Sequence, residues 1–326
     1  MHPKLLNSGW IFAICAIGIS STWAQAPSAY PAKPIRLIVP FAAGGPADVV
    51  AREMGQILGK ELGQPLIIEN QGGGAGVLAF NNVVRSPADG YTLLFAAAGN
   101  IVVQPLLQVK RVDVLTQLAP IGLVTTSPHV LVVTGKLPIQ SVKELIDYAK
   151  ANPGKLNFGS AGVGGLAHLG VELLKYTANI DITHVPYKGT SQVTSDLAGG
   201  QVQALFSSMP SLQGMIEKKM ITPIGITSAS NSSSMKGLPV ISKAGVSGFE
   251  YTTWYGIFST IGTPQPVIEK INAALVKTGA DKAFRDRLEA QGVDINISSP
   301  KELADLTRKE TGQWEKIIRE AKIELN

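Results

Sequence analysis

Residues 35–48, IRLIVPFAAGGPAD, contain the pattern that decides the fold. The first six residues form an apolar run, as expected for a strand in a parallel sheet that is buried on both faces. A loop of small residues follows. Pro46 suits the first turn of a helix, because that position needs no backbone N–H donor. The stretch therefore predicts a strand, a tight turn and a helix, the repeating unit of α/β sheets.

The rest of the chain repeats this alternation. We expect further strands at 66–69, 92–96, 118–124, 130–134, 156–159, 183–186, 204–207, 222–227 and 255–260. We expect helices at 47–62, up to 85, from 141 to about 151, and at 167–176, 264–277, 281–291 and 300–323. Ser141 with Glu144, and Ser299 with Glu302, have the spacing of a helix capping box. The alternation predicts an α/β fold with mainly parallel sheets.

Composition excludes several classes of protein. The chain has 326 residues, which is enough for two ordinary domains. Charged residues make up 16% and hydrophobic residues 45%, unlike a disordered protein or a coiled coil. The net charge is +5, but no cluster of Lys and Arg stands out, so we expect no nucleic-acid partner.

Residues 1–26 have the features of a secretory signal peptide. A weakly basic start precedes an uncharged apolar run at 10–19, and Ala24-Gln25-Ala26 is an A-x-A cleavage pattern. Cleavage after Ala24 also fits. The apolar run is shorter than the roughly 20 residues that a membrane span needs. We therefore expect a periplasmic chain that loses its single cysteine, Cys15, with the signal and so has no disulfide.

The pattern of residues 35–48 recurs at 156–168, LNFGSAGVGGLAH. In both copies small residues let a ligand approach the backbone. Both also place free N–H groups at a helix start, where the helix dipole favours an anion. The alternative is that the glycines only permit tight turns.

Motifs for catalysis are incomplete. Residues 74–79 and 162–167 fit G-x-G-x-x-A, but the strand after the first copy ends without the acidic residue of a dinucleotide site. Phe158 occupies the first glycine position of a G-x-S-x-G elbow. No histidine pair has zinc-binding spacing. His168 could contact a ligand or cap its turn, and His184 is expected to be a hydrogen-bonded structural residue. We expect no catalytic residue, metal or cofactor.

Longer motifs resemble one family. They are YPAKPIRLIVPFAAGGPAD at 30–48, SPADGYTLL at 86–94, SAGVGGLAHL at 160–169, HVPYKG at 184–189, DLAGGQV at 196–202, WYGIF at 254–258 and GTPQPVIEKINAAL at 262–275. Together and in this order they are similar to the Bug family, the extracytoplasmic solute receptors of tripartite tricarboxylate transporters.

The resemblance implies a two-lobed, type II-like periplasmic binding protein with a ligand cleft between its lobes. Lobe 1 would comprise 27–127 with 253–326, and lobe 2 would comprise 128–252. The family holds a ligand carboxylate between loops of both lobes, partly through water. The matching positions are Phe41, Ala43, Gly44, Gly45, Asp48, Ser160, Ala161, Gly162, Gly164 and His168. Further candidates to line the site are Ala97, Asn100, Tyr187 and Gly189, and Ser207 and Ser208 at a position where the chain departs from the family. Ser207 and Ser208 replace an Asp-Asn pair of many relatives, which disfavours a ligand with an ammonium group.

The function implied is that of a periplasmic, monomeric receptor that delivers a small organic acid to two membrane components of a transporter. The acid could be a mono-, di- or aromatic carboxylate. A second hypothesis keeps the fold but has the bound receptor signal to a membrane sensor. A third, from another class, is an exported hydrolase or nucleotide-dependent enzyme, for which the sequence lacks a complete set of catalytic residues.

Overall fold

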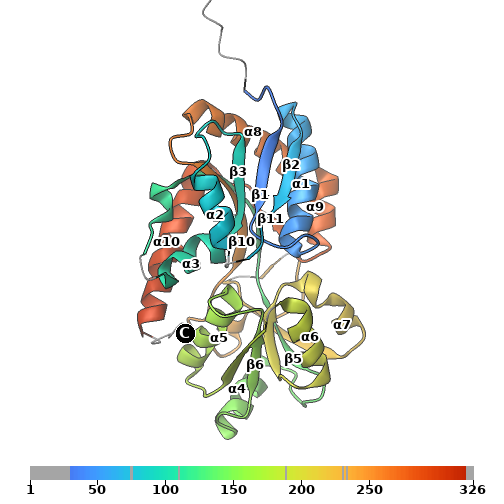
Figure 1. The fold of residues 1–326 in the computed structure, drawn as a ribbon. Helices are drawn as coiled ribbons and strands as arrows, with labels where there is room; N and C mark the ends of the chain where they lie inside the picture. Colours follow the sequence, from blue (N-terminus) through green and yellow to red (C-terminus); the bar gives the residue numbers. More distant parts are fainter. Residues whose placement is uncertain are drawn as a thin grey trace, which may run out of the picture.

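The computed structural model describes residues 30–73, 76–108, 111–187, 189–229, 231–232 and 234–320. Within these ranges the chain folds into two lobes stacked end to end, each built on one β-sheet with helices packed against it (Figure 1). We call the lobe with the six-stranded sheet lobe 1 and the lobe with the five-stranded sheet lobe 2. The predicted α/β class and two-lobed architecture are confirmed. The predicted signal segment, 1–26, and Cys15 lie outside the described residues.

The lobe 1 sheet joins strands from both ends of the chain. In spatial order they are β11 (Asp294–Ile295), β4 (Leu118–Ser127), β10 (Thr253–Thr260), β3 (Thr92–Ala97), β1 (Ile35–Val39) and β2 (Leu66–Asn70). Strand β1 pairs in parallel with β2 and β3. Strand β10 pairs antiparallel with β3 and β4, and β11 pairs antiparallel with β4.

The lobe 2 sheet is mixed in the same way. In spatial order its strands are β7 (Thr183–Pro186), β6 (Asn157–Ser160), β8 (Ala204–Ser207), β5 (Val130–Thr134) and β9 (Ile221–Ile226). Across the described sheets four pairings are parallel and five are antiparallel, so the prediction of mainly parallel sheets is wrong. Strands β5 and β10 each enter their sheet from the other lobe. They do not follow a helical crossover within one sheet, which would make them parallel.

Alternate residues of the central strands face different cores. Leu37 and Val39 of β1 pack in a cluster with α1, α8 and α9, whereas Ile38 faces a second cluster. That second cluster continues into lobe 2, where it includes Leu131 and Phe158. The two lobes therefore share one continuous apolar core.

Most predicted helices are present, with ends shifted by a few residues. They are α1 (Pro46–Leu62), α2 (Val77–Val84), α4 (Val142–Ala151), α5 (Leu166–Ala178), α8 (Gln265–Ala280), α9 (Lys282–Glu289) and α10 (Pro300–Glu320). The described residues also form α3 (Gln104–Leu107), α6 (Thr190–Gly199) and α7 (Gln213–Glu217). The sequence did not predict the π-helical turn Gly99–Val103 that runs into α3, nor the two-residue strand β11. Among the described helices, none is long and apolar enough to span a bilayer.

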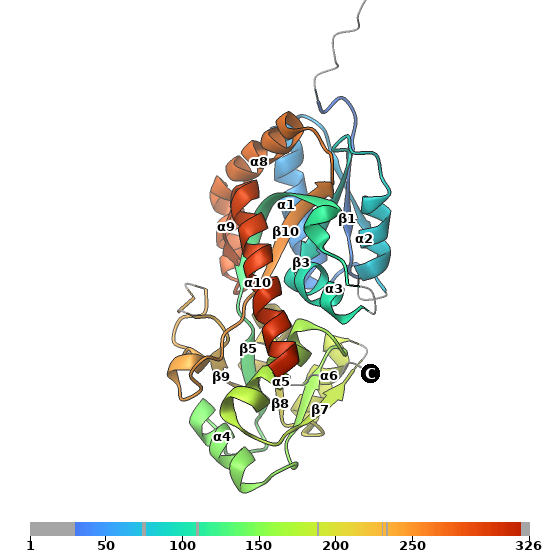
Figure 2. The ribbon, with the colours of Figure 1, turned by 90° about the vertical axis from the view of Figure 1, so that its left-hand side faces the viewer.

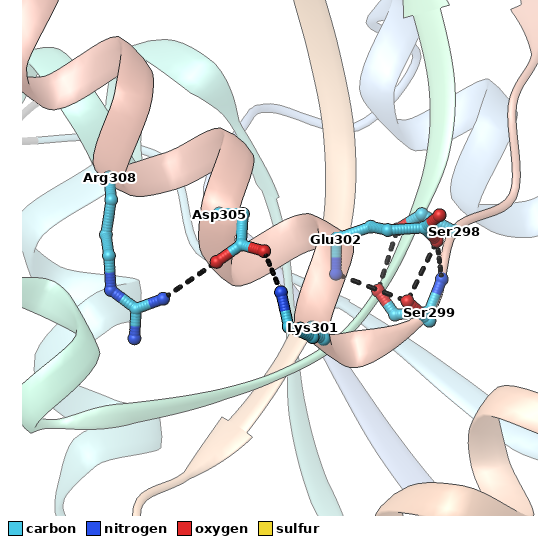
Figure 3. A network of polar contacts seen from close by, with 6 residues as sticks. All are labelled: Ser298, Ser299, Lys301, Glu302, Asp305 and Arg308. Atoms are coloured by element: carbon cyan, nitrogen blue, oxygen red, sulfur yellow. Dashed lines mark hydrogen bonds and ion pairs between the residues drawn. The ribbon is translucent and has the colours of Figure 1, made fainter.

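The predicted capping box of Ser299 and Glu302 forms in full, and that of Ser141 and Glu144 forms in part, because the Glu144 carboxylate accepts the Gln140 N–H instead of the Ser141 N–H. At the start of α10 the Glu302 N–H donates to Ser299 Oγ over 3.2 Å, and the Glu302 carboxylate accepts the Ser299 N–H over 2.8 Å (Figure 3). At the start of α4 the Glu144 N–H donates to Ser141 Oγ over 3.2 Å. These side chains satisfy N–H groups that have no partner inside the helix.

Two segments of the chain cross between the lobes, and they lie next to each other. The crossing from β4 to β5 and the one from β9 to β10 are tied by reciprocal bonds. The His129 N–H donates to Thr227 Oγ1, and the Thr227 N–H donates to the His129 carbonyl, both over 3.0 Å. Helix α10 runs beside them from lobe 1 toward lobe 2 (Figure 2). There Trp314 meets the Tyr251 ring edge to face, with centroids 6.1 Å apart.

Candidate functional site

Loop 1, residues 40–45, leads from β1 into α1. Gly44 has a φ of +80°, in the left-handed region that favours glycine. Its N–H donates to Asp48 Oδ2 over 2.8 Å. Gly45, the N-cap, has an extended backbone and makes no side-chain capping bond. The first turn of α1 thus starts without a side-chain cap, which is the arrangement in which a helix start can hold an anion.

Asp48 anchors loop 1 to the neighbouring strand. Arg52 Nε donates to the same carboxylate oxygen over 2.9 Å, and Arg52 Nη2 donates to Asn70 Oδ1 over 3.0 Å. Asn70 in turn donates to the Phe41 carbonyl over 3.2 Å. Burial acts to raise the pKa of Asp48, but the hydrogen bonds from Arg52 and Gly44 outweigh it and lower that pKa. The ionised carboxylate therefore serves the turn before its own helix.

Loop 2, residues 161–165, has the same geometry between β6 and α5. Gly164 has a φ of +76°, and its N–H donates to His168 Nδ1 over 3.1 Å. Gly165, the N-cap, is extended and again makes no side-chain capping bond. The two loops predicted to be similar from the sequence thus share three features. They have the same backbone conformation, neither helix start has a side-chain cap, and in each the left-handed glycine donates to the side chain four residues later.

His168 caps its turn, which was one of its two predicted roles, and it packs on a second histidine. It is 5% exposed, and its ring centroid lies 4.1 Å from that of His184. His184 Nε2 lies 2.6 Å from Ser160 Oγ, so its predicted role as a hydrogen-bonded residue is confirmed. Burial lowers the pKa of His168, and burial together with His168 lowers the pKa of His184 to about 4. Both rings are therefore neutral at neutral pH.

The segments that follow β3 and β6 touch across the lobes. Gln104 Nε2, in α3, donates to the Gly164 carbonyl over 3.3 Å. A Cβ on Gly164 would lie 2.8 Å from Leu107 Cδ1. Strands β1, β2 and β3 are parallel, and so are β6, β7 and β8, so each set has its carboxyl ends at one edge of its sheet. These two edges face each other across the lobes (Figure 1). Ligands of open α/β sheets bind beyond such ends.

The other predicted residues of lobe 1 lie near the same edge. Ala97 ends β3, and its N–H donates to Asn100 Oδ1 over 3.2 Å. The Phe41 ring packs edge to face against Tyr255, with centroids 6.4 Å apart. Ala43, at the tip of loop 1, is exposed. Within the described ranges, no hydrogen bond joins loop 1 directly to loop 2.

The other predicted residues of lobe 2 also gather at the ends of parallel strands. The Tyr187 N–H donates to the Ser160 carbonyl over 2.9 Å, beside Ala161 and Gly162 of loop 2. Gly189 is the N-cap of α6 and makes no side-chain capping bond. This is a third uncapped helix start of the described site region.

Ser207 and Ser208 lie where β8 ends. Ser211 Oγ donates to the Ser208 carbonyl over 2.7 Å, and Ser207 Oγ lies 2.8 Å from Ser211 Oγ. Since the Ser211 proton is used, Ser207 is the donor in that second bond. These hydroxyls carry no charge that could balance a ligand ammonium.

Sequence reasoning missed several residues around the loops. Arg52 stands four residues after Asp48, a spacing that indicates a helical ion pair, so this one could have been found. Asn70, Ser211, Gln104 and Leu107 carry no such local signal. Gln104 and Leu107 lie in α3, which directly follows the unpredicted π-helical turn.

The arrangement offers binding groups and no accessible nucleophile–base pair. The Ser160–His184 contact has the length of such a pair, but Ser160 is 0% exposed, and its hydroxyl also bonds the Gly162 carbonyl over 3.0 Å. Across the described ranges, no group of three or more His, Cys, Asp or Glu side chains is placed to hold a metal ion.

Known proteins share this chain's sequence and fold. Residues 50–323 match the family described as tripartite tricarboxylate transporter family receptor. A Rhodopseudomonas palustris protein solved with adipate is 31% identical, with a TM-score of 0.83 over 90% of this chain and 99% of that one. The periplasmic binding protein BugD is 31% identical, with a TM-score of 0.79 over 90% of this chain and 99% of that one.

MatC of Rhodopseudomonas palustris, solved with bound malate, is a further neighbour. It is 29% identical, with a TM-score of 0.77 over 89% of this chain and all 100% of that one. The family match covers well over half of the sequence, and it agrees with the resemblance carried by the motifs. The chain belongs to the Bug-type receptor family of the tripartite tricarboxylate transporters.

Proposed function

We propose that this chain captures a small organic carboxylate between its lobes and delivers it to the membrane components of a tripartite tricarboxylate transporter. One observation carries the proposal. Two helix starts of the same geometry, one in each lobe, lack a side-chain cap and lie at sheet edges that face each other. Helix starts of this kind attract anions. The adipate and malate bound by the two neighbours are both carboxylates.

In this proposal loops 1 and 2 hold one carboxylate jointly, and the ends of β3, β7 and β8 surround the rest of the ligand. Lobe 1 consists of residues 27–127 with 253–326, and lobe 2 of residues 128–252. The ligand stabilises the state in which both lobes contact it. Because Ser207 and Ser208 are uncharged, the ligand carries no essential ammonium group.

The proposed receptor works as a monomer in the periplasm, after removal of residues 1–26, and makes or breaks no covalent bond. The signal-like pattern at the start of the chain supports this location. The name of the neighbour BugD, a periplasmic binding protein, supports it as well. The membrane components of the transporter would recognise the closed, loaded form.

Calorimetry with the mature chain tests capture. Adipate, malate, succinate and glutarate are titrated after a thermal-shift screen, with adipamide as an uncharged control of the same length as adipate. At 100 times its dissociation constant a ligand adds about 2.7 kcal/mol to the free energy of unfolding. We expect at least one carboxylate to bind and adipamide not to bind. Equal binding of adipamide would contradict carboxylate recognition.

Uptake measurements test delivery. Proteoliposomes that contain the cognate membrane components are supplied with a labelled carboxylate that binds in the first experiment. We expect uptake only when the purified receptor is added. Uptake of the same rate without the receptor would contradict a role in delivery, even if binding is established.

A further inference from the structure

The His168 ring occupies a position where only its neutral form fits. Its Nδ1 accepts the Gly164 N–H over 3.1 Å, so Nδ1 carries no proton and the proton of the neutral ring is on Nε2. That nitrogen points toward Glu172 Oε1, 4.0 Å away. Protonation would place a second N–H at Nδ1, facing the Gly164 N–H. Two donors cannot share a hydrogen bond, so the contact would break.

His184 holds the start of the same loop. The Ser160 hydroxyl donates to the Gly162 carbonyl over 3.0 Å and accepts the Gly162 N–H over 3.3 Å. His184 Nε2, 2.6 Å away, is then the donor to the remaining lone pair. The proton and both lone pairs of the Ser160 hydroxyl are then used in hydrogen bonds. Ser160 and Gly162 are thereby fixed relative to β7.

The two rings form one electrostatic unit. Their centroids are 4.1 Å apart, so a proton on one ring disfavours a proton on the other. The charged groups that face them are on α5: Glu172 near His168, and Lys175, whose Nζ lies 2.8 Å from Glu172 Oε2. Glu172 favours a charge on His168, whereas Lys175 disfavours a charge on either ring. Burial is the largest influence on both and keeps them neutral.

We propose that His168 and His184 are positioning residues that make the conformation of loop 2, and its contact with lobe 1, depend on pH. In their neutral forms they hold Gly164 and Ser160. Protonation of His168 releases the Gly164 N–H. The Gly164 carbonyl, which accepts the interlobe bond from Gln104, moves with it. The proton that releases the loop is the one on His168 Nδ1, because a proton on His184 would leave its Nε2–H donor to Ser160 in place.

Loop 1 provides an internal control in the same molecule. Gly44 has the same backbone conformation and the same acceptor position, but its acceptor is the Asp48 carboxylate. The pKa of Asp48 is lowered by its hydrogen bonds, so this acceptor keeps its charge through mildly acidic pH. The Gly44 amide should therefore not respond in the range where the Gly164 amide does.

Nuclear magnetic resonance of the ligand-free mature chain tests the proposal. The imidazole signals of His168 and His184, and amide exchange at Gly164 and Gly44, are followed from about pH 8 to about pH 4.5. We expect the His168 imidazole to titrate first, below the ordinary histidine range, and the His184 imidazole to begin to titrate only at the acidic end. The protection of Gly164, corrected for the pH dependence of intrinsic exchange, should fall at least about tenfold over the same interval, while that of Gly44 stays constant.

Two variants test whether the neutral His168 ring holds Gly164 through its hydrogen bond or only fills space beside the loop. In His168→Asn the amide oxygen can accept the Gly164 N–H but does not titrate, so Gly164 should stay protected at acidic pH. In His184→Gln the His168 ring and its bond to Gly164 remain, so Gly164 should still lose protection in acid as it does in the parent. A Gly164 amide that stays protected while the His168 ring titrates would overturn the proposal. So would a His168→Asn variant that loses protection in acid as the parent does. Because no ligand is used, this result is independent of the proposed function.

Discussion

Loop 1 and loop 2 have the same backbone but are fixed by different groups. Gly44 and Gly164 have φ values of +80° and +76°, and each donates to the side chain four residues ahead. In loop 1 that acceptor is a carboxylate held by Arg52, and in loop 2 it is a neutral imidazole packed against the tilted ring of His184. The comparison teaches that the backbone requires an acceptor at this position but not a charge.

The surroundings of the loops differ as well. A Cβ on Gly44 would have no heavy atom within 4 Å, whereas a Cβ on Gly164 would lie 2.8 Å from Leu107 and 3.2 Å from Gln104. Loop 1 is anchored within its own lobe, while loop 2 leans on the opposite lobe. Of the two loops, loop 2 is therefore the one that contacts the opposite lobe.

Valine at the two extended N-cap glycines should have the largest effect. Gly45 and Gly165 have φ values of −78° and −77°, and added Cβ atoms would lie 3.4 and 3.7 Å from their nearest neighbours. Both positions can thus accept a side chain without backbone strain, unlike Gly162, whose φ is +144°. If the loops hold one carboxylate jointly, each variant should weaken binding about 100-fold, or about 2.7 kcal/mol.

Calorimetry with a carboxylate that binds the parent measures this loss, and circular dichroism checks that the fold is intact. Weaker binding in only one of the two variants would contradict joint binding by both loops, because it would assign the carboxylate to one lobe. Parent-like binding by both would exclude the two helix starts as the site.

Removal of the acceptor side chain, Asp48 in loop 1 or His168 in loop 2, should lower the free energy of unfolding. Only the loss caused by removing His168 should depend on pH in mild acid. Asp48→Ala removes the charged acceptor that the Gly44 N–H and Arg52 share, which costs about 2 kcal/mol of unfolding free energy. Because the pKa of Asp48 is lowered in the fold, its contribution is present above its ordinary value of 3.8 and is lost only as pH falls further. The pKa of His168 is lowered from 6.5, so its contribution is present above that value and decreases as pH falls below it.

Urea denaturation at about pH 7.5 and about pH 5 measures the difference. We expect the effect of Asp48→Ala to be equal at both values and that of His168→Ala to shrink at the lower one. A His168→Ala effect that is constant between them would show that the imidazole is not neutral by virtue of the fold.

Alanine at the two left-handed glycines should show a smaller effect. The left-handed conformation costs a residue with a Cβ about 1–2 kcal/mol. Gly44→Ala has this cost alone, whereas Gly164→Ala also displaces Leu107 and Gln104. We expect Gly164→Ala to be the more destabilising by about 0.5–1 kcal/mol in urea denaturation. Equal losses would mean that the contact between loop 2 and α3 contributes no stability.

Matched ligands should show a preference of about tenfold, or about 1.4 kcal/mol, for the acid without an amine. Succinate is compared with aspartate, and glutarate with glutamate, by calorimetry at neutral pH. The acid closest to loop 1, Asp48, is 3% exposed, and its unpaired Oδ1 atom is buried from any ligand. Tighter binding of the amino acids would contradict this preference and identify an acid that approaches the site on closure.

The sequence by itself determined the elements and the family. Apolar runs and glycine spacing located the described β1 to β10 and the main helices, because these signals act between residues that are close along the chain. The same locality revealed the repeated loop and the serine caps of α4 and α10. The motifs around the loops also sufficed to identify the receptor family, before any distance was known.

Only the tertiary structure decided how these elements meet. The antiparallel entry of β5 and β10, the Asn70 bond to loop 1, the packing of His184 against His168 and the contact of Gln104 with Gly164 all join residues far apart in sequence. Such pairings depend on how the chain crosses between lobes and on which side chains the shared core leaves in reach. No local pattern specifies them, because the residues involved are common types whose partners are set by packing.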